Sequence, residues 1–140
     1  MKTTDFRATN LRATDLMIGD WVKLSKGNWS KNRQVGLTDI EMIAESVYLA
    51  EPIPLTPEIL EKNGWKDIST HTLKGCETYK LTYEQNSFDY TITVKLRGYF
   101  KLQSYDDGYY TLCEMDYGVK YVHELQHALK LCGIEKEITL

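Results

Sequence analysis

The feature that most constrains the fold is a regular alternation of apolar and polar residues in the second half of the chain. It runs through residues 78–84 and again through residues 88–97. Because successive side chains of a strand point to opposite faces, each run predicts a β-strand with one face buried and one face in water. Gly98 predicts a turn, and we expect further strands near residues 99–105 and 109–114. This half of the chain should therefore form an antiparallel meander.

Two helices are predicted, one before and one after the meander. All three prolines lie within residues 52–57 and predict an extended junction. Thr56 is a suitable N-cap for a short helix that begins at Pro57. A longer helix is expected from about residue 119 to residue 132, where apolar residues recur at helical spacing. We therefore expect residues 56–140 to contain a helix, the meander and a C-terminal helix, and to pack with the preceding region or beside it.

The first half of the chain has a different pattern. Its apolar clusters are short and show neither a helical period nor a long alternation, so they predict several short strands and no helix. Such strands are typical of a small SH3-like β-barrel, which we place at residues 16–55. Residues 1–15 contain a five-residue duplication and are expected to form a mobile N-terminal arm. The fold class predicted for the whole chain is α+β.

Composition excludes several classes of protein. The 140 residues are 42% hydrophobic and 26% charged, with a net charge of -3, which argues against intrinsic disorder. No apolar run approaches the ~18–20 residues of a membrane span, and the N-terminus lacks the apolar stretch of a secretory signal. The three cysteines lack C-x-x-C spacing and argue against a disulfide framework. We therefore expect a cytoplasmic protein without a membrane partner.

Charge is distributed unevenly along the chain. Residues 21–38 carry four basic residues and no acidic one, whereas residues 39–140 carry ten basic and seventeen acidic residues. Lysines and arginines attract phosphates, and bases stack on aromatic rings, so the basic stretch is a candidate nucleic-acid-binding surface of a small barrel. The candidate residues are Lys23, Lys26, Trp29, Lys31 and Arg33. The alternative is a solvated loop without a ligand.

One motif in the last predicted helix is typical of an enzyme. His123, Glu124 and His127 form a literal H-E-x-x-H sequence. Residues four apart share a helix face, so both imidazoles could bind one Zn²⁺ while the glutamate acts as general base. Under this reading the protein is a zinc-dependent hydrolase.

Three observations argue against a zinc site. On a helical wheel both histidines lie opposite the apolar side of the helix and are expected to point at water. A catalytic zinc normally takes three protein ligands, and Lys130 and Gly133 occupy the positions of the longer metzincin motif. The elements predicted before the motif are nearly all strands, unlike the mixed order of zincins. We therefore predict a surface helix face, no catalytic residues, no metal ligands and no cofactor.

Three segments resemble a family of short uncharacterised proteins found in gut Bacteroidetes and in their phages or mobile elements. The segments are LMIGDWV at 16–22, EPIPLTPEIL at 51–60 and YVHELQHAL at 121–129. The resemblance implies a cytoplasmic accessory protein of bacterial or phage origin and assigns no functional residues. We expect a non-enzymatic module that binds a protein partner or assembles with itself. Nucleic-acid binding is the first alternative and zinc-dependent hydrolysis the second.

Overall fold

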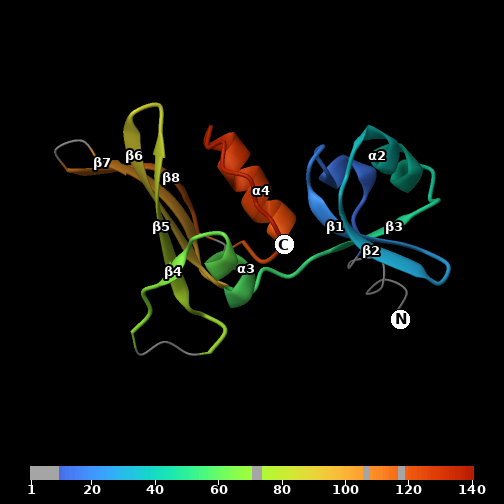
Figure 1. Ribbon diagram of the computed structural model, residues 1–140, viewed down its shortest axis with the longest axis horizontal. Coiled ribbons are helices and arrows are strands. Elements are labelled where there is room, and N and C mark those ends of the chain that lie inside the picture. The colour runs from blue at the N-terminus through green and yellow to red at the C-terminus, as the bar shows by residue number, and fades with distance from the viewer. Residues whose placement is uncertain (1–9, 71–73, 106–107, 117–118) are drawn as a thin grey trace. The chain divides into compact units, whose positions relative to one another are not determined.

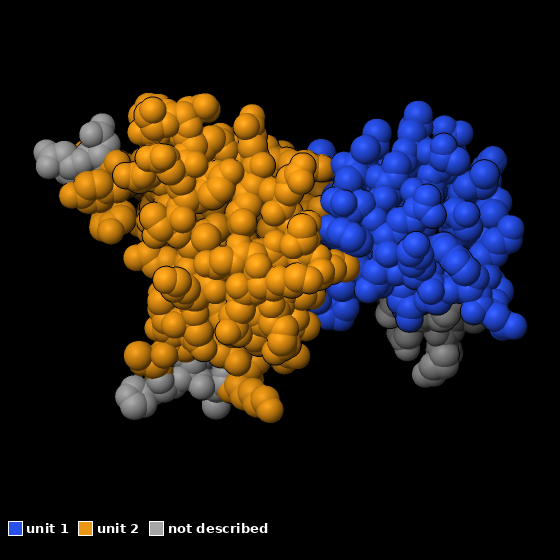
Figure 2. All heavy atoms as spheres, viewed as in Figure 1, with its two compact units in different colours: residues 1–54, 121–123 blue, residues 55–120, 124–140 orange. Residues whose placement is uncertain are grey.

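The computed structural model describes residues 10–70, 74–105, 108–116 and 119–140. The protein is α+β, as predicted, and divides into two compact units, which Figure 2 colours separately. The first unit comprises Met1–Pro54 and Tyr121–His123, and the second comprises Leu55–Lys120 and Glu124–Leu140. No helix in the described part of the chain is long and apolar enough to cross a membrane.

The first unit is built on a small antiparallel sheet with the strand order β2-β1-β3 (Figure 1). Its elements are the 3-10 helix η1 (Ala13–Asp15), β1 (Trp21–Lys26), β2 (Trp29–Gln34), α2 (Leu37–Ala44) and β3 (Leu49–Pro52). β1 is the central strand, and every second residue of it points into the core. The buried cluster consists of Leu16, Val22, Leu24, Val35, Ile43 and Ala50.

The predicted SH3-like barrel over residues 16–55 is wrong. Among the described residues this region forms three strands that do not close into a barrel, and residues 37–44 form a helix where strands were expected. The helix begins where the Gly36 N–H donates to Asp39 Oδ2 at 2.9 Å. It buries Ile43 and packs Ile40 against the same core. Because α2 has little more than two turns, it contains too few apolar residues to show a helical period.

The described part of the predicted N-terminal arm, residues 10–15, contacts the rest of the first unit. The Leu11 N–H donates to the Ala50 carbonyl oxygen at 2.7 Å, which places this segment against β3. Leu11 and Ala13 then pack against the core of the first unit. Residues 1–9 of the predicted arm lie outside the described residues.

The second unit contains the predicted meander, which is confirmed as a five-stranded antiparallel sheet with the order β4-β5-β6-β7-β8. Its elements are α3 (Pro57–Lys62), β4 (Lys66–Asp67), β5 (Thr78–Gln85), β6 (Phe88–Lys95), β7 (Phe100–Tyr105), β8 (Tyr109–Met115) and α4 (Val122–Leu131). The register pairs Leu81 with Ile92 and Ile92 with Leu102, so the alternating apolar residues share one face. We call this the core face.

The core face is buried beneath α4 and the C-terminal residues (Figure 1). Trp65, Phe100 and Leu125 are fully or almost fully buried, and the Trp65 Nε1–H donates to the Ile92 carbonyl oxygen at 3.2 Å. Gln85, at the end of β5, fixes the chain after α4. Its Nε2 donates to the Gly133 carbonyl oxygen at 2.8 Å, and its Oε1 accepts from the Glu135 N–H at 2.8 Å.

The short helix α3 begins as the sequence predicts. The Thr56 hydroxyl oxygen accepts a hydrogen bond from the Ile59 N–H at 3.3 Å, and Pro57 is the first helical residue. At its other end, Asn63 binds the last residues of the chain. Its Nδ2 donates to the Thr139 carbonyl oxygen at 2.7 Å, and its Oδ1 accepts from the Thr139 N–H at 2.9 Å.

Candidate interaction surface

The five predicted binding residues lie on the β1–β2 hairpin of the first unit but do not share one face. The register pairs Lys26 with Trp29 and Leu24 with Lys31, and this side of the hairpin also carries Arg33. Lys23 points to the opposite side, where its cross-strand partners are Asn32 and Glu51. The predicted set is therefore divided into four residues on one face and one residue on the other.

Two of the predicted charges have acidic neighbours. Arg33 Nε lies 3.5 Å from Asp39 Oδ2, and the Asp39 side chain is only 10% exposed. Lys23 lies opposite Glu51 in the β1–β3 ladder, and opposite charges across a ladder attract. Lys26 and Lys31 remain as the basic residues beside Trp29.

Trp29 makes an aromatic contact that the sequence did not indicate. Its ring centroid lies 5.7 Å from that of Tyr48, with an interplanar angle of 30°. Trp29 is 41% exposed and Tyr48 is half-buried. Tyr48 lies between α2 and β3, nineteen residues away, and no local sequence pattern connects the two rings. We call Lys26, Trp29, Lys31 and Tyr48 the Trp29 surface.

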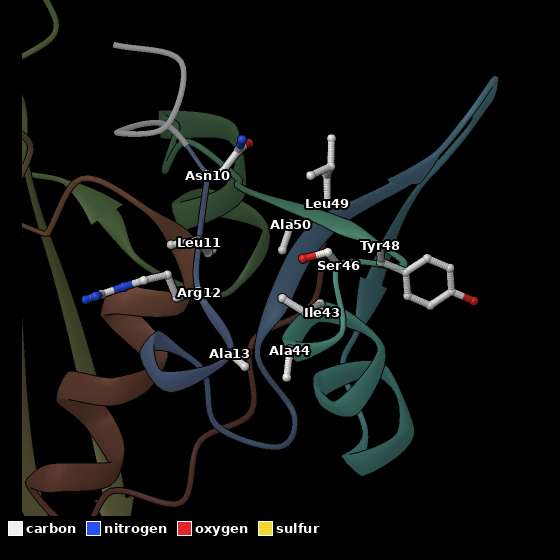
Figure 3. A pocket seen from close by; sticks show the side chains of 10 residues that line it. All are labelled: Asn10, Leu11, Arg12, Ala13, Ile43, Ala44, Ser46, Tyr48, Leu49 and Ala50. Atoms are coloured by element: carbon white, nitrogen blue, oxygen red, sulfur yellow. The ribbon is translucent and has the colours of Figure 1, made fainter. Parts of the chain in front are cut away.

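Tyr48 also borders a pocket of about 290 Å³ in the first unit (Figure 3). The pocket is lined by Asn10, Leu11, Arg12, Ala13, Ile43, Ala44, Ser46, Tyr48, Leu49 and Ala50. In Figure 3 the segment that contains Leu11 runs along one side and the end of α2 along the other. The Ser46 and Ala50 side chains point into the space between them, whereas the Tyr48 ring points outward. The volume suits one or two apolar side chains rather than a large cofactor.

Charge at the pocket comes from Arg12. Its guanidinium Nη2 lies 3.5 Å from Asp15 Oδ1 and is largely exposed, while its backbone N–H donates to Asp15 Oδ2 at 2.8 Å. The backbone hydrogen bond from Arg12 is the largest cause that lowers the pKa of Asp15, with smaller contributions from the Arg12 and His123 charges. The carboxylate is therefore held in its charged form at the start of η1.

The H-E-x-x-H residues lie on α4, and the expectation that both histidines point at water is wrong for His123. His123 is only 6% exposed, whereas His127 is partly exposed. The physical reason is that Val122 and His123, the first two residues of α4, pack within the first unit. The Val122 N–H donates to the Ile53 carbonyl oxygen at 2.9 Å, and the His123 ring stacks on Tyr121 at 6.1 Å. A helical wheel records one apolar side and misses contacts made by the rest of the chain.

Ligands for a catalytic metal are not assembled around the motif within the described part of the chain. No group of three or more His, Cys, Asp and Glu side chains has a metal-binding arrangement there. His71, the remaining histidine, lies outside the described residues. Two histidines leave a zinc ion short of the three protein ligands that catalytic sites use.

Cys132, one turn past the motif, is not a reactive thiol at neutral pH. Burial, together with a hydrogen bond to Cys113, raises the pKa of Cys132 to about 12. The thiol therefore stays protonated near pH 7, and a protonated thiol is a poor nucleophile.

In comparisons with known proteins, no family model, no curated protein and no solved structure matches this chain.

Proposed function

We propose that this protein is a non-enzymatic interaction module that binds another protein through the Trp29 surface. The observation that carries the proposal is the position of Tyr48, which contacts the exposed Trp29 ring and also borders the pocket. One partner segment can therefore cover both rings and insert a side chain beside Ala50. Tryptophan and tyrosine supply most of the binding energy in many protein interfaces, because a partner removes a large apolar area from water.

The charges beside the rings define the chemistry of the partner. Lys26 and Lys31 are exposed on the strand pair that carries Trp29, whereas Arg12 at the pocket is paired with Asp15. Basic groups at the rim of an interface favour a partner with acidic residues there. The best-fitting ligand is an extended segment with one apolar side chain flanked by Asp or Glu.

Nucleic-acid binding by the hairpin has less support. Arg33 is paired with Asp39, and Lys23 lies on the other face beside Glu51. Two lysines remain beside Trp29, and binding to nucleic acid strengthens with the number of phosphates that a protein neutralises. The geometry therefore favours a protein ligand over a polyanion.

We also propose a cytoplasmic location for the protein. Cys76, Cys113 and Cys132 are all free thiols. Reducing compartments keep cysteines in this state, whereas small secreted domains commonly pair them.

Site-specific photo-crosslinking in the cells that express the chain tests the proposed interface. The photoreactive residue p-benzoylphenylalanine replaces Tyr48 in one variant and Phe88 in the control, because Phe88 is an exposed aromatic residue of the second unit. We expect a discrete protein adduct from position 48 and at most a weak one from position 88. Adding Trp29→Ala to the position-48 variant should lower the yield at least about fivefold, because the partner loses a central aromatic contact.

The outcomes separate the two ligand classes. Equal adducts from both positions, or a yield that Trp29→Ala leaves unchanged, would overturn the proposal. Adducts that contain RNA or DNA instead of protein would support the nucleic-acid alternative. In that case Lys31→Ala should weaken binding of a single-stranded oligonucleotide and reduce its salt dependence.

A further inference from the structure

The five-stranded sheet has a second face, opposite the core face, which we call the open face. The register arranges its side chains in three rows that cross the strands. The basic row is Lys66, Lys80, Thr93, Lys101 and Glu114; the central row is Thr82, Thr91, Gln103 and Thr111; and the acidic row is Glu84, Asp89, Tyr105 and Tyr109. Lys95, opposite Thr78, extends the basic end.

Most side chains of the open face are accessible. Tyr105 and Tyr109 are 54% and 61% exposed, and their rings contact each other at 5.1 Å. Thr91 and Thr93 are 9% exposed, because they are short and lie in the central strand between longer side chains. Within the described part of the chain, none of the lysines of this face forms an ion pair. Lys66 and Lys80 therefore keep their positive charge available to a ligand, whereas Lys101 lies opposite Glu114 in the β7–β8 ladder.

The two ends of the open face have opposite charge. Three lysines of the basic row lie on β4, β5 and β7, and two adjacent carboxylates, Glu84 and Asp89, lie in the acidic row. The central row between them has hydroxyl and amide groups only. The charges of such a surface are complementary to those of a second copy rotated by 180°, because the basic end of one copy then faces the acidic end of the other.

We propose that the open face binds the open face of a second copy of this chain, with a two-fold axis along the central row. In a two-fold interface each contact occurs twice, and residues on the axis meet their own copies. A charged residue on the axis would repel itself, and none of the four residues of the central row is charged. The rotation places the basic row of each copy over the acidic row of the other.

The expected contacts follow from the strand positions. Lys80 and Glu84 both lie on β5, on either side of the central row, so Lys80 of one copy lies over Glu84 of its partner copy. Lys101 and Tyr105 have the same relation on β7. The Lys101 ammonium already lies 5.6 Å from the ring centroid of Tyr99, a cation–π contact of the kind expected with a tyrosine of the second copy.

The size of the face predicts a weak dimer. Strands are about 4.8 Å apart and alternate residues about 7 Å apart, so four strands and three rows cover roughly 400 Å² on each copy. Two copies would bury roughly 800 Å², less than the ~1,200 Å² of stable complexes. We therefore expect reversible association at high micromolar concentration, weakened by salt because the charged contacts are screened. The proposal concerns the second unit and does not rest on the function proposed for the Trp29 surface.

Analytical ultracentrifugation of the full chain, from about 10 to 1,000 µM, at low and high NaCl, tests the proposal. We expect wild-type protein to dimerise at the upper end of this range and more weakly in high salt. Lys80→Glu and Glu84→Lys should each raise the dimer Kd about tenfold, because each places like charges together twice. The double variant Lys80→Glu/Glu84→Lys should restore the Kd to within about threefold, because it exchanges the charges and keeps the pairs opposite.

Lys130→Glu is the matched control, since it makes the same change of charge at an exposed residue of α4, outside the open face. It should leave the Kd unchanged, and circular dichroism should show that every variant is folded. A protein that stays monomeric throughout the range would overturn the proposal, as would a dimer that both single variants leave intact. Retention of monomeric protein on heparin, lost in Lys80→Glu, would assign the face to a polyanion instead.

Discussion

The strands β2 and β6 belong to similar antiparallel hairpins but have opposite exposure. All six residues of β2 are exposed, whereas Thr91, Ile92, Thr93 and Val94 of β6 are buried in succession. β2 is an edge strand of a three-stranded sheet, and β6 is the central strand of five. The exposure of a strand therefore depends on how many strands flank it and on what covers its faces, not on its own sequence alone.

The two units also differ in the size of the side chains that they bury. The hydrophobic cluster of the first unit has no buried aromatic residue, whereas the second unit buries Trp65, Tyr79 and Phe100. Short domains of about 60 residues bury little surface and are marginally stable, and the first unit has this size. Segments that bind partners are commonly drawn from the less stable parts of a protein. We therefore expect the unit that carries the Trp29 surface to open first.

The largest loss of stability is expected from a core substitution in the second unit. Phe100→Ala removes a fully buried ring from the core face and should lower the free energy of unfolding by about 3–5 kcal/mol. Urea denaturation followed by circular dichroism measures the change. Phe88→Ala is the control, because this ring is 58% exposed, and should cost less than about 1 kcal/mol. Equal losses from both variants would contradict the assignment of Phe100 to the core.

A core variant of the first unit tests whether the units differ in stability. Leu24→Ala removes a fully buried side chain and should lower the free energy of unfolding of the first unit by about 2–4 kcal/mol. Hydrogen exchange should then show faster exchange in β1 and β3 and unchanged protection in β6. Leu37→Ala, at a position that is 62% exposed, should have little effect. If β6 lost protection equally, the two units would unfold as one, and the comparison between them would not hold.

The second unit could be predicted from the sequence because its signals are local. Alternation along β5 and β6 defines two strands, and Thr56 followed by Pro57 defines the start of α3. In the first unit the alternation is short, and the apolar spacing of α2 is too brief to separate a helix from a strand. The signal available in the sequence for α2 was Asp39, three residues after Gly36, since acidic residues are common in the first helical turn. In the structure its side chain accepts the Gly36 N–H.

The candidate site could be predicted only in part, because its decisive contacts join distant parts of the chain. The basic composition near Trp29 is a local feature, but the Tyr48 ring and the pocket arise from how β3 and α2 meet the N-terminal segment. The burial of His123 likewise depends on contacts with the first unit, made by the residues just before and within the start of α4. A helical wheel considers only the residues of the helix itself. It therefore cannot predict contacts that distant parts of the chain make with that helix.

A smaller loss of stability is expected when the side chain that caps the start of α2 is removed. Asp39→Ala removes the acceptor of the Gly36 N–H and the acidic partner of Arg33, and should destabilise the first unit by about 1 kcal/mol. Hydrogen exchange of the α2 amides measures the change locally. Glu41→Ala, an exposed position on the same helix, should change it by less than about 0.5 kcal/mol. If the two substitutions had the same effect, the capping role of Asp39 would be excluded.

The smallest effect concerns pH and the stability of the first unit. The pKa of Asp15 is lower in the folded protein than in the unfolded chain, chiefly because of the Arg12 backbone N–H. The unfolded state therefore binds more protons as the pH falls, so the stabilisation by Asp15 is present above the unfolded pKa of about 3.9 and is lost below it. Because the carboxylate is about one-third exposed, we expect Asp15 to contribute only a few tenths of a kcal/mol to the free energy of unfolding.

Asp15→Asn should lower stability at pH 7 by this amount and leave it unchanged at pH 2, measured by urea denaturation at both values. A larger loss at pH 2 than at pH 7 would show that the amide disturbs η1 itself, and would exclude the carboxylate charge as the cause.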